Sequence, residues 1–478
     1  MQEVVPAVAP VEAPPRRPGL LLAVACSAQF ICVLDASIVN VALPPMQDSL
    51  GLSPTGLQWV VSSYTLTFAG FLLLGGRVGD LFGRKRAFVV GLLVFAAASL
   101  VAGLAQVGWQ VVAARFAQGI GGAVLVPTTL SLVTTGFTDP RAKARALSLL
   151  TAAAASGGAL GGVIGGILTG LLSWRWVFFV NVPLGVLLVL AAVWALPGRP
   201  VGHVRGRLDV PGSVSVTVGT AALVSAVILG EERGWGSSAT LGCLGFAAAS
   251  FVLFVLVERR AEQPVVPLDV FRVRPVVVAN GLGALVGGLL PTTMFFLALY
   301  LQRVLGMDPL QAGLALTPGA VGIALGARGA SRWMAVLGPR RSYMLGTLLA
   351  AGALAWLSAI DVEGRYAVDV LVPLTLAMAG FGAAGLPLTV TAMSGLPPER
   401  AGLASGLLNT TRQVGSAVGL AALVSVASAW AARYGAPDSA AALTAGFGVG
   451  FLVGAGLLVV ACVGALALPD RLEAHRPR

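Results

Sequence analysis

The stretch AALTAGFGVGFLVGAGLLVVACVGALAL, residues 441–468, contains no charged side chain. A helix of about 20 apolar residues crosses the roughly 30 Å hydrocarbon core of a bilayer. Residues 87–105 form a second uncharged run of this kind, and similar runs recur along the whole 478-residue chain. The sequence therefore predicts an all-α integral membrane protein.

The composition excludes a soluble protein of this length. Only 11% of the residues are charged and 57% are hydrophobic, whereas about 25% of an average soluble domain is charged. Too little polar sequence is present to cover a soluble surface. The four cysteines lie in apolar runs without CxxC spacing and both histidines lie in loops, so we expect no metal site, disulfide or histidine-based catalytic triad.

Fourteen spans are predicted by reading apolar runs between polar breaks, an even number that leaves both termini on one side of the membrane. Their order predicts two six-helix bundles with two additional transmembrane helices between them. The expected organisation is a tail at 1–18, an N-terminal bundle at 19–196, two inserted helices at 197–262, a C-terminal bundle at 263–468 and a tail at 469–478. The predicted helices are 19–43, 56–76, 87–106, 109–134, 145–172, 175–196, 210–230, 238–257, 275–301, 310–330, 342–360, 367–392, 401–430 and 440–468.

The basic residues give the predicted orientation. The formal charge of +11 is divided into small clusters between apolar runs and does not form one patch, which argues against a nucleic-acid partner. Alternate loops differ sharply in Lys and Arg: the clusters at 84–86, 141–145 and 340–341 belong to one set, and the opposite loops carry one Arg apiece. Because cytoplasmic loops are enriched in Lys and Arg, we expect a cytoplasmic-membrane protein with both termini in the cytoplasm.

A short internal repeat supports the division into halves. Residues 83–86 (GRKR) follow the second predicted helix, and residues 338–341 (GPRR) follow the tenth. Two six-helix halves would place the second copy after helix eight, so the sequence indicates an extra helix pair at about 208–258. Repeated halves around a central site are typical of secondary transporters.

Asp35 is the only acid well inside an apolar span. An ionised Asp at mid-bilayer is unfavourable by about 2.5–3.5 kcal/mol on insertion scales. Protonation lowers that cost, which makes such a carboxyl a natural proton carrier. The alternative is a carboxylate that is permanently paired and holds two helices together.

Two basic residues, Arg115 and Arg412, also fall inside predicted spans. A rise of about 1.5 Å per residue puts Asp35 and Arg115 at similar depths in the outer half of the membrane, so an ion pair between them is possible. Arg412 lies nearer the midplane. Its alternative reading is a packing role, with the guanidinium reaching towards the interface or bonded to carbonyl groups.

The glycine-rich run 157–166 (GGALGGVIGG) lies inside an apolar helix and lacks the Lys and the flanking strand of a nucleotide-binding loop. Its glycines recur at a spacing of four and predict a flat face for close helix packing, which could also bend or slide. No cytoplasmic segment is long enough for an ATPase, and no catalytic cluster is present. We therefore expect a transporter, not an enzyme, that uses an ion gradient or works passively.

Several stretches resemble the major facilitator superfamily and, within it, the fourteen-helix drug:proton antiporters. Residues 34–44 (LDASIVNVALP) are similar to that branch's first-helix motif, and 76–86 (GRVGDLFGRKR) to the superfamily's loop motif. Residues 115–123 (RFAQGIGGA) resemble the helix-four motif, and 157–166 the antiporter motif. Residues 174–183 (WRWVFFVNVP) and 409–415 (NTTRQVG) also look typical of these exporters.

The resemblance implies roles for particular residues. Asp35 and Arg115 would handle protons, and Asn40, Gln118, Asn409 and Arg412 are candidates for a central cavity. Two departures stand out: Gly162 replaces the usual proline of the antiporter motif, and Ala335 stands in the second half where the first half has Asp80. The residues assigned to a cytoplasmic latch are Gly76, Asp80, Gly83 and Arg84, and the antiporter-helix glycines are Gly157, Gly158, Gly161, Gly162, Gly165 and Gly166.

The resulting prediction is a proton-coupled antiporter that exports lipophilic small molecules, such as drugs, antibiotics or dyes, by alternating access. Its expected partners are that substrate, protons and the lipid bilayer, with no cofactor beyond the proton gradient and no obligatory protein partner. Three alternatives remain open: an exporter of one endogenous metabolite, a lipid exporter, and a passive uniporter.

Overall fold

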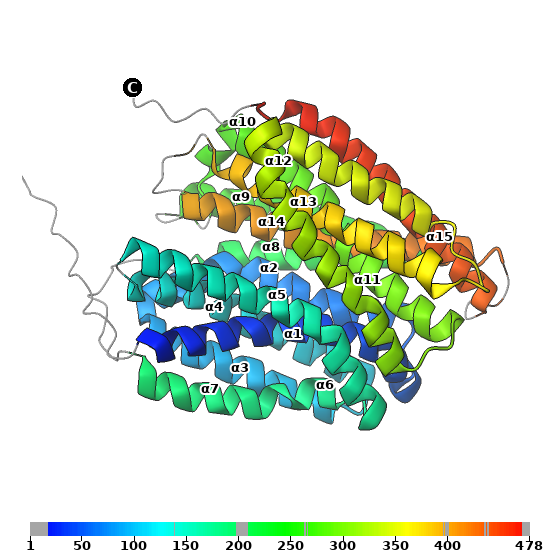
Figure 1. Cartoon of the computed structure of the whole chain (residues 1–478), viewed down its shortest axis with the longest axis horizontal. Coiled ribbons are helices and arrows are strands. Elements are labelled where there is room, and N and C mark those ends of the chain that lie inside the picture. Colours follow the sequence, from blue (N-terminus) through cyan, green and yellow to red (C-terminus); the bar gives the residue numbers. More distant parts are fainter. Residues whose placement is uncertain are drawn as a thin grey trace, which may run out of the picture.

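The computed structural model describes residues 18–137, 139–196, 209–261, 264, 266–394, 396, 401–434, 436 and 439–470. These residues form helices and connecting turns, without strands. In Figure 1 the helices run side by side along the molecule, with most of the first half of the chain in a lower layer and the second half above it. The tails predicted at 1–18 and 469–478 lie almost entirely outside the described residues.

The first half of the chain forms seven helical elements that match the first six predicted spans. The span predicted at 175–196 contains two of these elements, α6 and α7, which meet near Val180. Pro183 lies in the first turn of α7 and has no N–H to donate to the preceding turn, which accounts for the break. The elements are α1 (Pro18–Leu50), α2 (Pro54–Phe82), α3 (Arg84–Leu104), α4 (Gly108–Gly136), α5 (Pro140–Leu171), α6 (Trp176–Phe179) and α7 (Asn181–Ala195).

The remaining predicted helices are also present. The middle of the chain contributes α8 (Val210–Arg233) and α9 (Ser238–Arg260). The second half of the chain forms η1 (Leu268–Arg272), α10 (Arg274–Gly287), α11 (Leu289–Leu299), η2 (Tyr300–Val304), α12 (Pro309–Leu357), η3 (Tyr366–Leu371), α13 (Val372–Met393), α14 (Ala401–Ala431), α15 (Ala440–Gly464) and η5 (Ala465–Ala467).

Local sequence signals begin several of these helices. Ser53, Asp139 and Asp308 each precede a proline, and each side chain accepts a hydrogen bond from a backbone N–H in the first turn. Proline at the first helical position loses no hydrogen bond, and the capping oxygen satisfies a donor that the helix leaves free. These helix starts are therefore encoded locally.

Twelve helices of the described chain are long and apolar enough to cross a membrane. One of them, the 49-residue α12, contains Gly338 with φ 79°, so it consists of two helices that meet at a bend. The 29-residue α2 is not among the twelve. The all-helical membrane fold is confirmed, and the number of fourteen spans stays a prediction.

The internal repeat seen in the sequence is also a structural repeat. Gly83 and Gly338 both adopt positive φ, 91° and 79°, a region that strongly favours glycine. After the first glycine, Lys85 donates to the carbonyls of Val193 and Leu196 at the end of α7. After the second, Arg340 forms a 2.9 Å ion pair with Asp470, just beyond α15. In each half a basic residue thus holds the end of the last helix.

We expect Gly338→Ala to destabilise the C-terminal half. An added Cβ would lie 2.4 Å from the backbone oxygen of Asp470, and a left-handed backbone costs a residue with a Cβ about 1–2 kcal/mol. The measurement is thermal unfolding of the purified protein in detergent. Gly352→Ala is the matched control, since nothing lies within 4 Å of its added Cβ. Equal melting temperatures for the two variants would contradict the prediction.

The inserted helices α8 and α9 pack against each other, and α8 also contacts α2 and α14. Val224 and Ile228 of α8 are buried together with Ala417 and Ala421 of α14. Glu258 follows the predicted helix 238–257 and was therefore assigned to a loop, but it is buried near the end of α9 and accepts a 3.2 Å hydrogen bond from the Val266 N–H. That assignment was wrong because the chain after α9 folds back over the end of the helix.

The two halves meet through polar contacts at one end of the bundle. Arg303 forms an ion pair with Asp48 and donates to the Pro44 carbonyl at 3.2 Å. Gln302 donates to the Val41 carbonyl at 3.2 Å. The positive-inside pattern predicts this end to be the outer one. These hydrogen bonds join the end of α1 in the first half to η2 in the second half.

Candidate functional site

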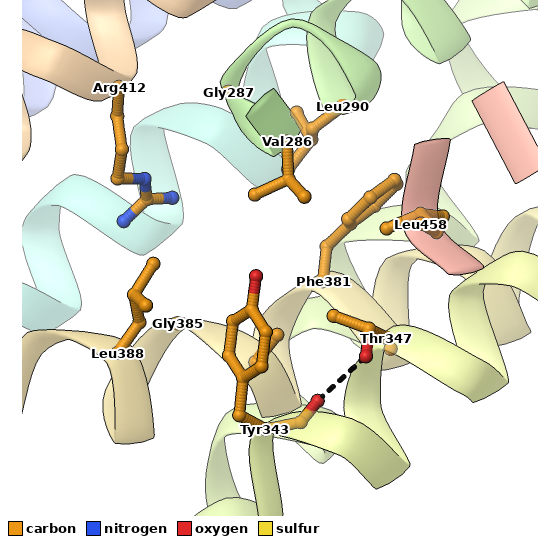
Figure 2. A pocket seen from close by; sticks show the side chains of 12 residues that line it. Val286, Gly287, Leu290, Tyr343, Thr347, Phe381, Gly385, Leu388, Arg412 and Leu458 are labelled. Atoms are coloured by element: carbon orange, nitrogen blue, oxygen red, sulfur yellow. Dashed lines mark hydrogen bonds between the residues drawn. The ribbon is translucent and has the colours of Figure 1, made fainter. Parts of the chain in front are cut away.

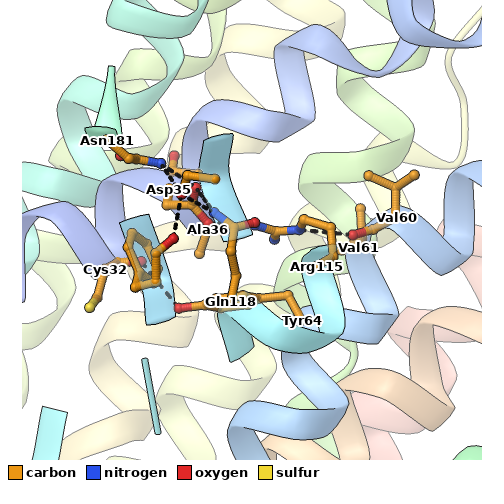
Figure 3. A network of polar contacts seen from close by, with 12 residues as sticks. Cys32, Asp35, Ala36, Val60, Val61, Tyr64, Arg115, Gln118 and Asn181 are labelled. Carbon is orange, nitrogen blue, oxygen red and sulfur yellow. Dashed lines mark hydrogen bonds and ion pairs between the residues drawn. The ribbon is translucent and has the colours of Figure 1, made fainter. Parts of the chain in front are cut away.

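Asp35 is fully buried in the middle of α1 and accepts three charged or polar donors (Figure 3). Arg115 of α4 forms an ion pair with its Oδ2. Gln118 Nε2 donates to its Oδ1 at 3.0 Å, and Asn181 Nδ2 donates to the same oxygen at 2.7 Å. The carboxylate is therefore compensated by one full charge and two amide donors, as a buried anion requires.

Arg115 has partners besides Asp35. Its Nε donates to the Val60 carbonyl at 3.1 Å, and Nη1 donates to Gln118 Oε1 at 3.1 Å. Its guanidinium carbon also lies 4.3 Å from the centre of the Tyr64 ring, within cation–π distance. The arginine is consequently held by α2 and α4 even without the carboxylate.

Small residues and a helix break bring these side chains together. An added Cβ on Gly119 would lie 2.4 Å from the Tyr64 carbonyl oxygen, so α4 lies directly against α2. The break between α6 and α7 lies at Asn181, whose side chain reaches Asp35. Ser99 of α3 completes the network by accepting hydrogen bonds from Gln118 at 2.6 Å and from Asn181 at 3.4 Å.

The structure brings together three of the residues chosen from the sequence: Asp35, Arg115 and Gln118. The predicted depth match between Asp35 and Arg115 is confirmed as direct contact. Sequence reasoning did not assign a role to Ser99 or Asn181. A signal was available, because each is a polar residue within a predicted span, but its partner lies in another part of the chain.

We expect a double-mutant cycle to report a strong coupling between Arg115 and Asp35. Arg115→Met leaves the Asp35 carboxylate buried without its counter-charge, which destabilises a protein by about 3–5 kcal/mol. In the Asp35→Asn background Arg115→Met leaves no buried carboxylate without its counter-charge, so it should lower the free energy of unfolding much less. The measurement is the free energy of unfolding in detergent micelles. The same loss in both backgrounds would contradict the prediction.

The α5 glycines form two packing faces. On one face Gly157, Gly161 and Gly165 approach α1, where an added Cβ would lie 2.4–2.8 Å from the nearest α1 atom. On the other, Gly162 and Gly166 approach the start of α12: the Cβ distances are 2.9 Å to the Gly313 oxygen and 2.6 Å to the Pro309 oxygen. Gly158 is less crowded, with Val33 at 3.7 Å. The predicted close packing is confirmed, and it joins the two halves of the chain.

The residues predicted to form a cytoplasmic latch lie around the turn from α2 to α3. Gly83 supplies the positive φ of this turn, and an added Cβ on Gly76 would lie 3.6 Å from Pro127 of α4. Arg84 donates to Thr135 Oγ1 of α4 at 2.9 Å. The Asp80 side chain lies outside the described part of the chain. The contacts described here lie within the N-terminal half, and a latch between the two halves stays a prediction.

The other predicted cavity residues are dispersed. Asn40 donates back to its own helix, to the Ser37 carbonyl at 3.2 Å. Asn409 is exposed on α14. Arg412 lines a cavity in the C-terminal half that is partly open to solvent (Figure 2). The structure therefore brings Arg412 to a cavity but does not bring the four candidates to one place.

Comparison with known proteins supports the fold and the family. The family model described as Major Facilitator Superfamily matches residues 25–420. The cephamycin export protein of Amycolatopsis lactamdurans is 40% identical over 90% of this chain and 88% of its own length. The puromycin resistance protein of Streptomyces alboniger is 37% identical over 86% and 82%, respectively.

Solved structures show the same architecture at low sequence identity. The nucleoside transporter NupG superimposes with a TM-score of 0.67 at 12% identity and covers 94% of this chain. A bacterial homologue of the lysosomal transporter Spinster, in an inward-facing conformation, gives a TM-score of 0.63 at 16% identity over 95% of this chain. With the family match and the curated relatives, these likenesses establish that the chain is a multi-pass membrane protein that belongs to the Major Facilitator Superfamily.

Proposed function

We propose that this chain is a proton-coupled antiporter that exports lipophilic small molecules across the cytoplasmic membrane, with both termini in the cytoplasm. The observation that carries the proposal is Asp35, a fully buried carboxyl group that is paired with Arg115 inside the bundle. A group that can exchange a full charge for a proton at this depth is suited to coupling transport to a proton gradient.

Protonation of Asp35 changes what holds the site together. The carboxylate attracts Arg115, Gln118 and Asn181, whereas the neutral acid loses the Coulomb attraction to the guanidinium. Arg115 would keep the Val60 carbonyl, Gln118 and the Tyr64 ring as partners. The ion pair can therefore loosen on protonation without leaving the arginine unsatisfied, which is what a reversible proton switch requires.

The packing around Asp35 gives this switch a route to the interface between halves. Two residues along α1, Ser37 donates to the Gly158 carbonyl of α5 at 3.0 Å and also lies against Gly161. The next glycines of α5 contact α12 in the other half. A movement of α1 on protonation would therefore displace α5 and change the contact between α5 and α12, here called the seam. Transport is coupled to protons if the arrangements of the two halves before and after this movement differ in their proton affinity.

The named relatives support export of antibiotic-like compounds as the activity. One is a cephamycin export protein and another a puromycin resistance protein, and both match this chain over most of their length. We therefore place the expected substrates among lipophilic or amphiphilic small molecules of that size. An exporter of a single compound is the second candidate, favoured by the relative that is named for cephamycin alone.

Reconstitution tests the proposal directly. We expect the purified full-length chain in liposomes to accumulate a lipophilic dye when a pH gradient is imposed, and to lose that accumulation when a protonophore collapses the gradient. Dye entry should be accompanied by proton movement in the opposite direction, followed with an internal pH indicator. Accumulation that persists without the gradient, or dye equilibration without proton movement, would refute proton coupling and favour a uniporter.

A further inference from the structure

Arg412 is a cation within the membrane region whose counter-charge is missing from the described chain. It lies on α14, and its guanidinium points into the cavity of the C-terminal half (Figure 2). Arg115, by contrast, is neutralised by Asp35. Among the described residues the Arg412 side chain forms neither an ion pair nor a hydrogen bond. A charge in this setting normally has a partner, so the site is complete only with an anion bound.

Tyr343 provides a second, independent observation at the same cavity. Its side chain is fully buried, yet its hydroxyl has no hydrogen-bond partner among the described residues. Figure 2 shows this hydroxyl pointing into the space that lies between Val286 and the Arg412 guanidinium. Buried hydroxyl groups nearly always have a partner. The two unsatisfied groups therefore converge on the same space.

The packing of α10 against α14 fixes the position of Arg412. An added Cβ on Gly287 would lie 2.2 Å from the Arg412 carbonyl oxygen, and one on Gly283 would lie 3.1 Å from Arg412 Cγ. Both the backbone and the start of the side chain are thus held by glycines of the neighbouring helix. The guanidinium is held as part of the cavity wall, in contrast to an arginine whose flexible stem reaches to the membrane surface.

The rest of the cavity wall is mostly apolar. The side chains of Val286, Leu290, Phe381 and Leu388 surround the space between Arg412 and Tyr343. Pockets that bind organic molecules combine such apolar walls with a few polar groups that fix the orientation of the ligand. An inorganic anion would gain nothing from these walls, whereas an amphiphilic organic anion matches both the cation and the apolar surface.

We propose that Arg412 and Tyr343 bind the carboxylate group of an amphiphilic organic anion, which is the substrate. The guanidinium can donate two parallel hydrogen bonds to a carboxylate, and the Tyr343 hydroxyl can donate a third. The apolar part of the substrate lies against Phe381 and the neighbouring aliphatic side chains. The proposal rests on the exporter function proposed above and names the substrate class that its C-terminal half selects.

Equilibrium binding to the purified full-length chain tests the proposal. The ligands are 1-pyrenebutyrate and 1-pyrenebutanol, which differ only in the carboxylate, and binding in phosphatidylcholine nanodiscs is followed by energy transfer from tryptophan to pyrene. We expect the carboxylate to bind at least about tenfold more tightly than the alcohol. Arg412→Gln should abolish this preference while leaving the affinity for the alcohol within about twofold of the parent.

Three further variants separate binding from folding. Arg412→Lys keeps the charge but loses the planar fork, so we expect an intermediate preference. Tyr343→Phe should reduce the preference by a smaller factor. Arg433→Gln is the matched control: Arg433 is exposed just beyond α14, lies 4.6 Å from the Trp430 ring and is far from the cavity lining. It should behave as the parent.

Several results would overturn the proposal. The parent protein could bind both ligands equally, or Arg412→Gln could retain the full preference for the carboxylate. Loss of the preference when phosphatidylglycerol is added to the nanodiscs would assign the site to a lipid headgroup instead of the substrate. Because binding is measured without a proton gradient, a chain that binds the carboxylate selectively but shows no proton-driven transport would refute only the exporter function.

Discussion

Asp35→Asn is expected to abolish uphill export, so that the dye inside and outside proteoliposomes reaches equal concentration even under an imposed pH gradient. The substitution preserves the size of the side chain but removes the titratable group, and the protein then has no means of binding a proton at this position. Substrate exchange in the absence of a gradient should continue. The neutral amide resembles the protonated acid, the form in which the attraction to Arg115 is weakened.

Three measurements define this prediction. Uphill accumulation and substrate-driven proton movement should both disappear, whereas exchange of labelled for unlabelled dye should remain within about tenfold of the parent. Glu363→Gln, a substitution at an exposed acid between α12 and η3, is the matched control and should retain all three activities. If Asp35→Asn still accumulated dye at the parental rate, Asp35 would be a structural carboxylate, and the coupling site would have to be sought elsewhere.

Gly313→Ala is expected to shift the chain away from the arrangement seen in this structure. The added Cβ would lie 2.0 Å from the Gly162 carbonyl oxygen, a backbone atom of the long helix α5 that cannot move aside locally. Since α5 and α12 belong to different halves, the clash is relieved only when the halves separate at this seam. A shift of at least about tenfold in population, or about 1.4 kcal/mol, should follow.

Spin labels can detect this shift. Exposed residues Gln106 and Glu363 lie in the loops after α3 and α12, at the end where Arg303 contacts Asp48. In a background without the four native cysteines, the distance between labels at these two positions should lengthen in Gly313→Ala. Gly352→Ala, in α12 beyond the Gly338 bend with nothing within 4 Å of its added Cβ, should leave this distance unchanged. Identical distance distributions for Gly313→Ala and the parent would contradict the prediction.

The contact between α5 and α12 explains why glycine suits position 162, where the antiporter motif usually has a proline. Residue 162 faces α12 across the interface, and its added Cβ would lie 2.9 Å from the Gly313 oxygen. A larger residue would hold the two halves further apart at this point. α5 runs without an internal proline from Pro140 to Leu171, so glycine here permits close contact between halves rather than a bend.

The helices and the unusual charge of Asp35 could be predicted from the sequence because both are local properties. A run of apolar residues long enough to cross a bilayer must satisfy its own backbone hydrogen bonds, and a helix does so whatever lies beside it. A single acid within such a run can likewise be recognised from the sequence alone. The depth estimate that paired Asp35 with Arg115 needed only the helical rise.

The partners of these charges were decided by the tertiary structure. Asn181 reaches Asp35 across 146 positions of sequence because the break at Pro183 and the packing of α7 bring it there. Glu258 was misplaced because the segment that buries it follows the helix and folds back. Burial and pairing depend on which helix faces meet. Close approaches such as that of Gly162 to Gly313 decide which faces meet, and they leave no periodic pattern in the sequence.

The sequence by itself determined that this protein crosses a membrane many times, which loops carry its charge and which three ionisable residues were left inside. Only the tertiary structure decided that two of them, Asp35 and Arg115, neutralise each other while Arg412 faces a cavity with no counter-charge among the described residues. The physical reason is that the cost of placing a charge in hydrocarbon is a property of one residue, whereas its compensation requires a second group that packing must bring within hydrogen-bonding distance.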